Sequence, residues 1–141
     1  MPRAKLTLDE FQALASHGVP YVGLLGCRTE VFEAGRVVVR LPWQPMLLRP
    51  GGSLCGPAMM ALADITLYGV VLSRIGRVEL AVTTDLAFHF LSKPRDADLL
   101  AEGRLLRLGR TLAVGEVTLT SDGAEHPVAH CVGTYAIPQE A

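Results

Sequence analysis

The stretch GGSLCGPAMMALADITLYGVVLSRI, residues 51–75, decides how this chain folds. Gly56 can cap a helix and Pro57 can be its first helical residue, because the fixed φ and the missing N–H of proline suit that position. We expect the helix to continue to about Ile75, where a glycine follows. Almost every side of it is apolar, and such a helix is normally buried. The sequence therefore predicts one long central helix in which Asp64 is the only carboxylate.

Shorter elements flank this helix on both sides. A capping box formed by Thr7 and Glu10 predicts a short N-terminal helix. Six segments are predicted as strands: residues 21–32, 36–41, 79–91, 97–108, 110–120 and 127–137. Because tight turns join consecutive strands, a parallel doubly wound sheet is excluded. The prediction is a single α+β domain over residues 1–141, with an antiparallel sheet of about six strands wrapped around the central helix.

The composition limits the class of protein. Half of the 141 residues are apolar, 19% are charged, and the formal net charge is −1. Nucleic-acid binding needs a basic face, so that class is excluded. So little charge on a small chain favours an oligomer, an apolar ligand cavity, or both. The three cysteines lack the spacing of a zinc site or of a disulfide framework, and we expect a reduced, cytoplasmic protein without a metal.

Asp64 is the most informative residue. A carboxylate in an apolar helix is paired, protonated or functional, because burying an unpaired charge is costly. The structural alternative is a salt bridge to Arg49 or Arg74. Charges at Asp64 and Arg74 also argue against a membrane-spanning helix.

At the start of the helix, the N–H groups of Gly56 and Ala58 could stabilise a developing oxyanion.

The spacing of these two features predicts a site shared between subunits. Gly56 and Asp64 are eight residues apart, which is about 12 Å along a helix. One carbonyl group cannot contact both within a chain, so a common reaction centre requires a two-fold dimer with antiparallel central helices. A different reading makes Cys55 a nucleophile with His89 or His130 as its base.

Two further polar groups lie in the predicted strands. They are the cluster Thr83, Thr84 and Asp85, and the arginines Arg104, Arg107 and Arg110 around a turn. The arginines could bind phosphates, whereas sheet-surface threonines and a solvated arginine face are the structural alternatives. Alternation within 79–91 places one set of apolar residues on a common face: Leu80, Val82, Leu86, Phe88 and Phe90.

The order of these features resembles that of hotdog-fold acyl-CoA thioesterases of the phenylacetate-pathway (PaaI-like) type, in the 4-hydroxybenzoyl-CoA thioesterase superfamily. The segments that carry the resemblance are GSLCGPAMMALAD (52–64), VTTDLAFHFLSKP (82–94), LGRTL (108–112) and VAHCVGT (128–134). That family has G-x-x-H-G-G before its catalytic Asp in L-A-D. Here Cys55 and Pro57 replace the histidine and the second glycine, and Arg49 stands where many members have asparagine.

The resemblance implies a role for individual residues. Asp64 would be the catalytic carboxylate, which activates water or attacks the thioester. The N–H of Gly56 would contribute to the oxyanion hole, and Thr83 would help to hold the water. We expect substrate contacts from a further set of residues: Arg49, Cys55, Met60, Tyr68, Thr84, Arg107 and Arg110.

The resemblance also implies a homodimer or a dimer of dimers with active sites at the subunit interface. The expected substrate is a small to medium or aromatic acyl-CoA thioester, so coenzyme A is part of the substrate and no separate cofactor, nucleic acid or membrane is expected. The alternative is a non-catalytic hotdog protein that binds acyl-CoA or a lipid ligand. A hotdog dehydratase is a weaker reading, because it needs a histidine beside a carboxylate and the sequence shows no such pair.

Overall fold

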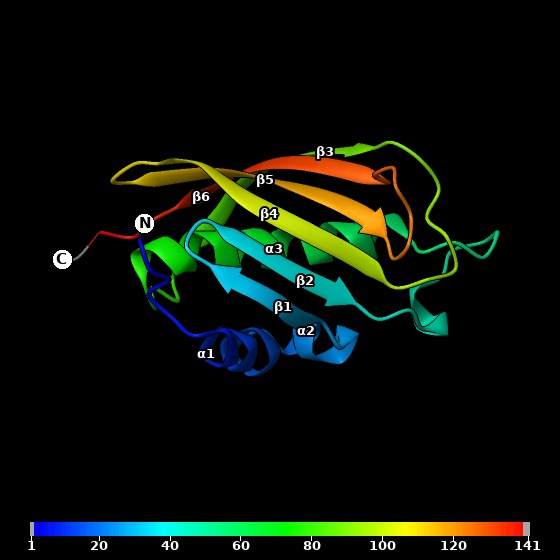
Figure 1. The fold of residues 1–141 in the computed structure, drawn as a ribbon, viewed down its shortest axis with the longest axis horizontal. Helices are drawn as coiled ribbons and strands as arrows, with labels where there is room; N and C mark the ends of the chain where they lie inside the picture. Colours follow the sequence, from blue (N-terminus) through cyan, green and yellow to red (C-terminus); the bar gives the residue numbers. More distant parts are fainter. Residues whose placement is uncertain (1, 140–141) are drawn as a thin grey trace.

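The fold is an antiparallel sheet curved around one long helix, as seen in a computed structural model that describes residues 2–139 (Figure 1). The elements are α1 (Leu8–Ala13), the π-helix η1 (Leu14–Gly18), α2 (Pro20–Leu25), β1 (Arg28–Glu33), β2 (Arg36–Leu41), the 3-10 helix η2 (Pro45–Leu47), α3 (Gly56–Ile75), β3 (Val82–Phe90), β4 (Leu99–Leu108), β5 (Leu112–Ser121) and β6 (Ala129–Ala136). The strand order is β1-β2-β4-β5-β6-β3. This is the predicted α+β architecture of the hotdog fold, and the capping box of Thr7 and Glu10 opens α1 as expected.

The central helix α3 occupies the concave side of the sheet. It begins at Gly56, one residue earlier than predicted, so that Cys55 is the N-cap and Pro57 lies in the first turn, where no intrahelical N–H is required. Gly76, with φ of 91°, ends it. The helix is long and apolar enough to cross a membrane, but 72% of its most apolar window is buried inside the domain. Such burial is typical of the core helix of a folded domain.

Three glycines let α3 lie close against the sheet. Gly103, Gly115 and Gly133 come from β4, β5 and β6. A Cβ on Gly115 would lie 2.5 Å from one Leu67 methyl carbon, and a Cβ on Gly133 would lie 2.5 Å from the other. Because real side chains do not approach so closely, these positions require glycine if Leu67 is to remain at the centre of the core.

The predicted strand over residues 21–32 is wrong in its first half. Residues Pro20–Leu25 form helix α2, and β1 begins only at Arg28. Pro20 at the first helical position and Gly26 in the left-handed conformation (φ 74°) are the start and stop signals of a short helix. Val22 and Leu25, three positions apart, pack against the core on one side of a helical turn, while Tyr21 and Leu24 are exposed.

A β-bulge in β3 changes which side chains face the helix. The pairing of β3 with β6 shifts register between Thr83 and Asp85. One extra residue reverses the alternation on one side of the bulge. The predicted common face is therefore correct only in part: Leu86 and Phe88 pack against the core, as predicted. Leu80, Val82 and Phe90 are exposed, and Thr83 turns inward in place of Val82.

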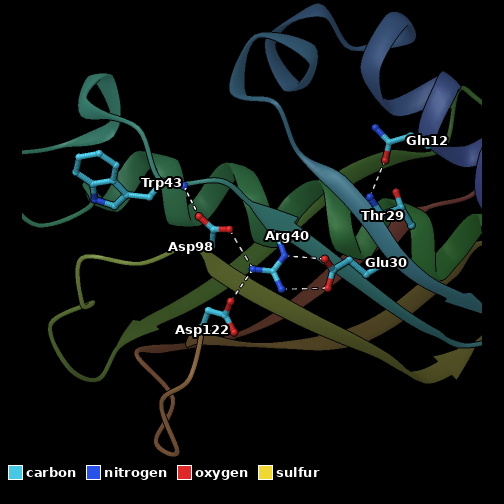
Figure 2. Close-up of polar contacts among 7 residues, drawn as sticks. All are labelled: Gln12, Thr29, Glu30, Arg40, Trp43, Asp98 and Asp122. Atoms are coloured by element: carbon cyan, nitrogen blue, oxygen red, sulfur yellow. Dashed lines mark hydrogen bonds and ion pairs between the residues drawn. The ribbon is translucent and has the colours of Figure 1, made fainter.

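Polar contacts fix the edge of the sheet and the N-terminal helix (Figure 2). The Arg40 guanidinium donates to Glu30 at 2.6 Å, to Asp122 at 2.8 Å and to Asp98 at 3.0 Å, which joins β1 and β2 to the ends of β4 and β5. The Gln12 side chain accepts a hydrogen bond from the Thr29 backbone N–H at 2.6 Å and so holds α1 against β1.

Candidate active site

The site is built around the carboxylate of Asp64, which lies midway along α3 and is partly buried. Its Oδ1 accepts a hydrogen bond from the Thr83 hydroxyl at 2.7 Å and another from the Tyr135 hydroxyl at 2.6 Å. The three residues come from α3, β3 and β6, so the fold assembles the site from distant parts of the chain. Two hydroxyl donors stabilise the ionised form of a carboxylate.

Local structure explains why both hydroxyls reach Asp64. The bulge after Thr83 turns that side chain toward α3. Strand β6 alternates regularly between buried and half-buried residues, and Tyr135 is on its buried side with 4% of its surface exposed. Burial and the adjacent charge of Asp64 raise the pKa of Tyr135 above its ordinary value. Its hydroxyl therefore stays protonated and available as a donor through neutral pH.

An apolar cavity of about 490 Å³ opens beside Asp64. Its walls come from α3, from the N-terminal helices η1 and α2, and from the segment that leads into β3; they include Leu14, Val19, Val22, Ile65, Tyr68 and Leu80. The charged residues among its lining are Asp64 and Glu79, and no lysine, arginine or histidine is among them. The cavity can therefore take an uncharged apolar group, with the Asp64 carboxylate at its wall.

A second hollow of about 430 Å³ lies at the start of α3. Arg49, Gly56 and Lys93 are among the residues that line it, together with the ring of Phe90. The N–H groups in the first turn of a helix have no partner within the helix, and the Cys55 side chain does not cap them. This hollow thus combines backbone donors, the positive end of the helix dipole and two cationic side chains.

Of the remaining candidate substrate-binding residues, only some line these hollows. Tyr68 lines the Asp64 cavity and donates its hydroxyl to the Glu79 carbonyl at 2.9 Å. Met60 is 40% exposed and is not among the residues that line either hollow. Thr84 is exposed and donates to the carbonyl of Thr134 at 3.2 Å.

Arg107 and Arg110 are exposed and flank the turn between β4 and β5. Figure 1 shows that this turn and the start of α3 are at opposite ends of the domain. Arg110 donates to the Gln139 side chain at 3.0 Å. Within one chain, these arginines are therefore remote from the hollow at Gly56.

Two alternative interpretations of the site require contacts that are absent among residues 2–139. Asp64 forms no ion pair with Arg49 or Arg74; its carboxylate instead accepts hydrogen bonds from the Thr83 and Tyr135 hydroxyls. Cys55 forms no hydrogen bond to His89 or His130 in that part of the chain. A Cys–His catalytic pair is therefore not assembled.

The sequence was expected to contain no histidine beside a carboxylate, and this expectation is wrong. His130 Nε2 lies 3.2 Å from Glu116 Oε2, because neighbouring strands β5 and β6 bring them together. Both residues alternate with the side chains that face α3, so they lie on the outer face of the sheet. Neither lines a described cavity, and the pair is a cross-strand surface contact.

Tyr135 is the site residue that sequence reasoning missed. It is 71 positions from Asp64, and no motif connects the two. One signal was available: alternation along the last strand puts this tyrosine on the buried side, and a buried tyrosine hydroxyl normally has a hydrogen-bond partner. Only the strand order shows that this partner is Asp64.

Several known proteins resemble this chain. A solved structure described as a putative thioesterase (TM1040_1390) from Silicibacter sp. TM1040 is 42% identical with a TM-score of 0.88, over 96% of this chain and 94% of that one. The curated protein "Putative esterase SSO2140" of Saccharolobus solfataricus is 34% identical over 85 residues, so that the match spans 60% of this chain and 60% of that relative.

A mutant of the phenylacetic acid degradation protein PaaI from Thermus thermophilus is 23% identical with a TM-score of 0.75, over 84% of this chain and 99% of that one. At that identity the likeness shows the fold alone. The model of the "Thioesterase superfamily" matches residues 51–127, which include α3, β3 and both Asp64 and Thr83. Because that match covers more than half of the 141 residues, this protein belongs to the thioesterase superfamily.

Proposed function

We propose that this protein is an acyl-CoA thioesterase in which Asp64 is the catalytic carboxylate. The observation that carries the proposal is a hydroxyl-bound carboxylate at the wall of an apolar cavity. As a general base, Asp64 takes a proton from water while the water oxygen bonds to the thioester carbon; the C–S bond then breaks and the sulfur leaves with a proton. As a nucleophile, its oxygen bonds to that carbon, the thiolate leaves, and water hydrolyses the resulting anhydride.

The cavity supports an uncharged apolar acyl group as the substrate. Its lining contains the carboxylates of Asp64 and Glu79 and no cationic side chain. An acyl group with a free carboxylate would therefore be repelled, whereas a small to medium alkyl chain or an aromatic ring would bury its surface against Leu14, Val22 and Ile65. Coenzyme A would be part of the substrate, and the proposed reaction needs no metal or separate cofactor.

The active site is proposed to be shared between two subunits. Asp64 and Gly56 line different hollows and are about 12 Å apart along α3. In a two-fold dimer, the first-turn N–H groups at Gly56 of one subunit would stabilise the oxyanion formed beside Asp64 of the partner subunit. Arg49 and Lys93 next to Gly56, or Arg107 and Arg110 at the far turn, would then supply cations for the phosphates of coenzyme A.

The first test is the substitution Asp64→Asn, measured by thiol release from a panel of straight-chain and aromatic acyl-CoA thioesters. The amide keeps the size of the carboxylate and an oxygen that accepts from both hydroxyls, so we expect the fold to be retained. The rate should fall by about 10²–10⁴-fold, because a neutral amide is neither a base nor a nucleophile. Asp96→Asn, which removes an exposed carboxylate in the turn before β4, is the matched control.

The same assay separates the alternative function. A binding protein without catalysis would release no thiol from any thioester, yet acyl-CoA would raise its melting temperature. An Asp64→Asn variant that turns over at the wild-type rate would contradict the catalytic role of Asp64. A succinyl or malonyl thioester cleaved as fast as a neutral one would contradict the proposed acyl specificity.

A further inference from the structure

The two hydrogen bonds to Asp64 converge on a single oxygen atom. Thr83 and Tyr135 approach from different strands, and both donate to Oδ1. The Tyr135 hydroxyl also lies 3.1 Å from the backbone carbonyl of Asp64. It has one proton, and the charged oxygen, at the shorter distance of 2.6 Å, is the stronger acceptor for it.

The other carboxylate oxygen is left open. Within residues 2–139, Oδ2 takes part in no hydrogen bond, and no buried side-chain oxygen in that range is without a partner. Oδ2 is therefore accessible, and Asp64 contributes to the cavity wall. The carboxylate has one anchored oxygen and one oxygen that can meet water or a substrate.

We propose that Tyr135 is a positioning residue that, together with Thr83, anchors Oδ1 of Asp64 and so commits Oδ2 to the reaction. This inference rests on the proposed function, since it assigns the reacting atom of the proposed catalytic carboxylate. An unanchored aspartate rotates about χ2 and presents either oxygen in many orientations. Two donors from two strands of one sheet restrict that rotation, and a correctly oriented reacting group is a large part of enzymatic rate enhancement.

Tyr135 suits this role because its own position is restricted. It is 4% exposed, and its ring centroid lies 5.9 Å from that of Tyr68 on α3. Burial and the Asp64 charge raise its pKa, which keeps the hydroxyl protonated as a donor. Thr83, on the bulged segment of β3, supplies the second donor from a different strand.

The test compares Tyr135→Phe and Thr83→Val with the wild type, since each substitution removes one hydroxyl and nearly preserves shape. We expect kcat to fall about 10- to 100-fold in Tyr135→Phe, with KM changed less than about threefold, because the donor acts on the reacting group and not on substrate binding. This split between kcat and KM is the informative readout, because a merely structural loss would alter both.

Thr66→Val is the matched control. It removes a buried hydroxyl from the same helix, two residues from Asp64, and that hydroxyl donates to the Leu62 carbonyl at 2.7 Å. We expect its kcat and KM to equal those of the wild type. Circular dichroism and melting curves of all variants establish that they fold. A Tyr135→Phe protein with wild-type kcat would overturn the inference, even where Asp64→Asn is inactive.

A readout without catalysis keeps this inference distinct from the proposed function. Crystal structures of the wild type, Tyr135→Phe and Thr66→Val report the orientation of the Asp64 carboxylate without any turnover. We expect one ordered orientation about χ2 in the wild type and in Thr66→Val, and a rotated or disordered carboxylate in Tyr135→Phe. If the wild type releases no thiol from any thioester, the proposed function fails while these structures still decide whether Tyr135 anchors the carboxylate; an unchanged, ordered carboxylate in Tyr135→Phe overturns the anchor.

Discussion

The three cysteines of this chain differ in their exposure to solvent. Cys27 and Cys131 are 5% and 0% exposed, and burial raises the pKa of each to about 11. The charge of Asp64 adds to the effect at Cys131. Cys55 is only partly buried and lies at the N-cap of α3, next to the proposed oxyanion donors. A thiol reagent should therefore react with Cys55 at the site before it reacts with Cys27 and Cys131 in the core.

We predict that iodoacetamide at pH 8 modifies Cys55 and leaves Cys27 and Cys131 intact in the folded protein. Because their pKa is raised, only about one buried thiol in a thousand is ionised at that pH, and reaction becomes favourable only as the pH approaches 11. Peptide mass spectrometry measures the labelling, and unfolding in guanidinium should expose all three. Rapid labelling of Cys131 without unfolding would show that β6 opens in solution.

At this scale the sequence predicts the centre of the site better than its surroundings. Asp64 is conspicuous as a carboxylate in an apolar helix, and the family resemblance adds Thr83. Their hydrogen bond of 2.7 Å agrees with a common site. Tyr135 could not be assigned to it from sequence, because a contact across 71 residues depends on strand order and not on any local pattern.

At the scale of elements, local signals predict helices and strands where one pattern dominates. The apolar run and the flanking glycine place α3 to within one residue. Residues 21–25 have an apolar pattern compatible with either element, and the proline and glycine around them decide for a helix. The bulge in β3 has no sequence signature that would reveal it, although it determines that Thr83 faces Asp64.

The close contact between α3 and the sheet makes a prediction for Gly115→Ala. The new Cβ would lie 2.5 Å from a Leu67 methyl carbon and 2.9 Å from the Arg104 carbonyl oxygen, which is backbone and cannot rotate away. We expect a loss of about 1–3 kcal/mol in the free energy of unfolding, measured by urea denaturation.

Gly56→Ala is the control for this substitution. Its Cβ would meet only the Phe90 ring, at the ordinary contact distance of 3.4 Å, and alanine is tolerated in the first turn of a helix. Its stability should equal that of the wild type within about 0.5 kcal/mol. Equal stability of Gly115→Ala and the wild type would mean that α3 does not pack on the sheet as tightly as described.

At the scale of the whole molecule, β3 is the feature that points to a partner. It ends the strand order, so that within residues 2–139 only β6 pairs with it, and it is nine residues long. Val82 and Phe90 on this strand are 57% and 52% exposed, and Met60 of α3 is 40% exposed. A long apolar edge strand is a template for pairing with another chain. The low charge of the composition agrees with such a covered edge.

Subunit mixing tests whether the site is shared. Asp64→Asn removes the proposed carboxylate, and Gly56→Pro removes the proposed oxyanion N–H; each variant alone should lose at least about 10²-fold in rate. When the two are co-expressed and pair at random, half of the dimers contain both variants. Each such dimer combines one intact Gly56 with one intact Asp64 of the partner subunit. Thiol release should therefore recover to about a quarter of the wild-type value.

A site contained within one chain gives a different result, because every subunit in the mixture would still lack one of its two groups and no activity would return. Size-exclusion chromatography with light scattering checks that both variants assemble as the wild type does, which makes a negative result meaningful. The recovered fraction of wild-type activity is informative as well. With random pairing across a single two-fold interface, it is about a quarter when the two variants are expressed equally. It falls when either variant is in excess, because fewer dimers then contain both. Recovery would thus place the carboxylate and the helix start, which α3 holds about 12 Å apart, in one reaction centre made by two chains.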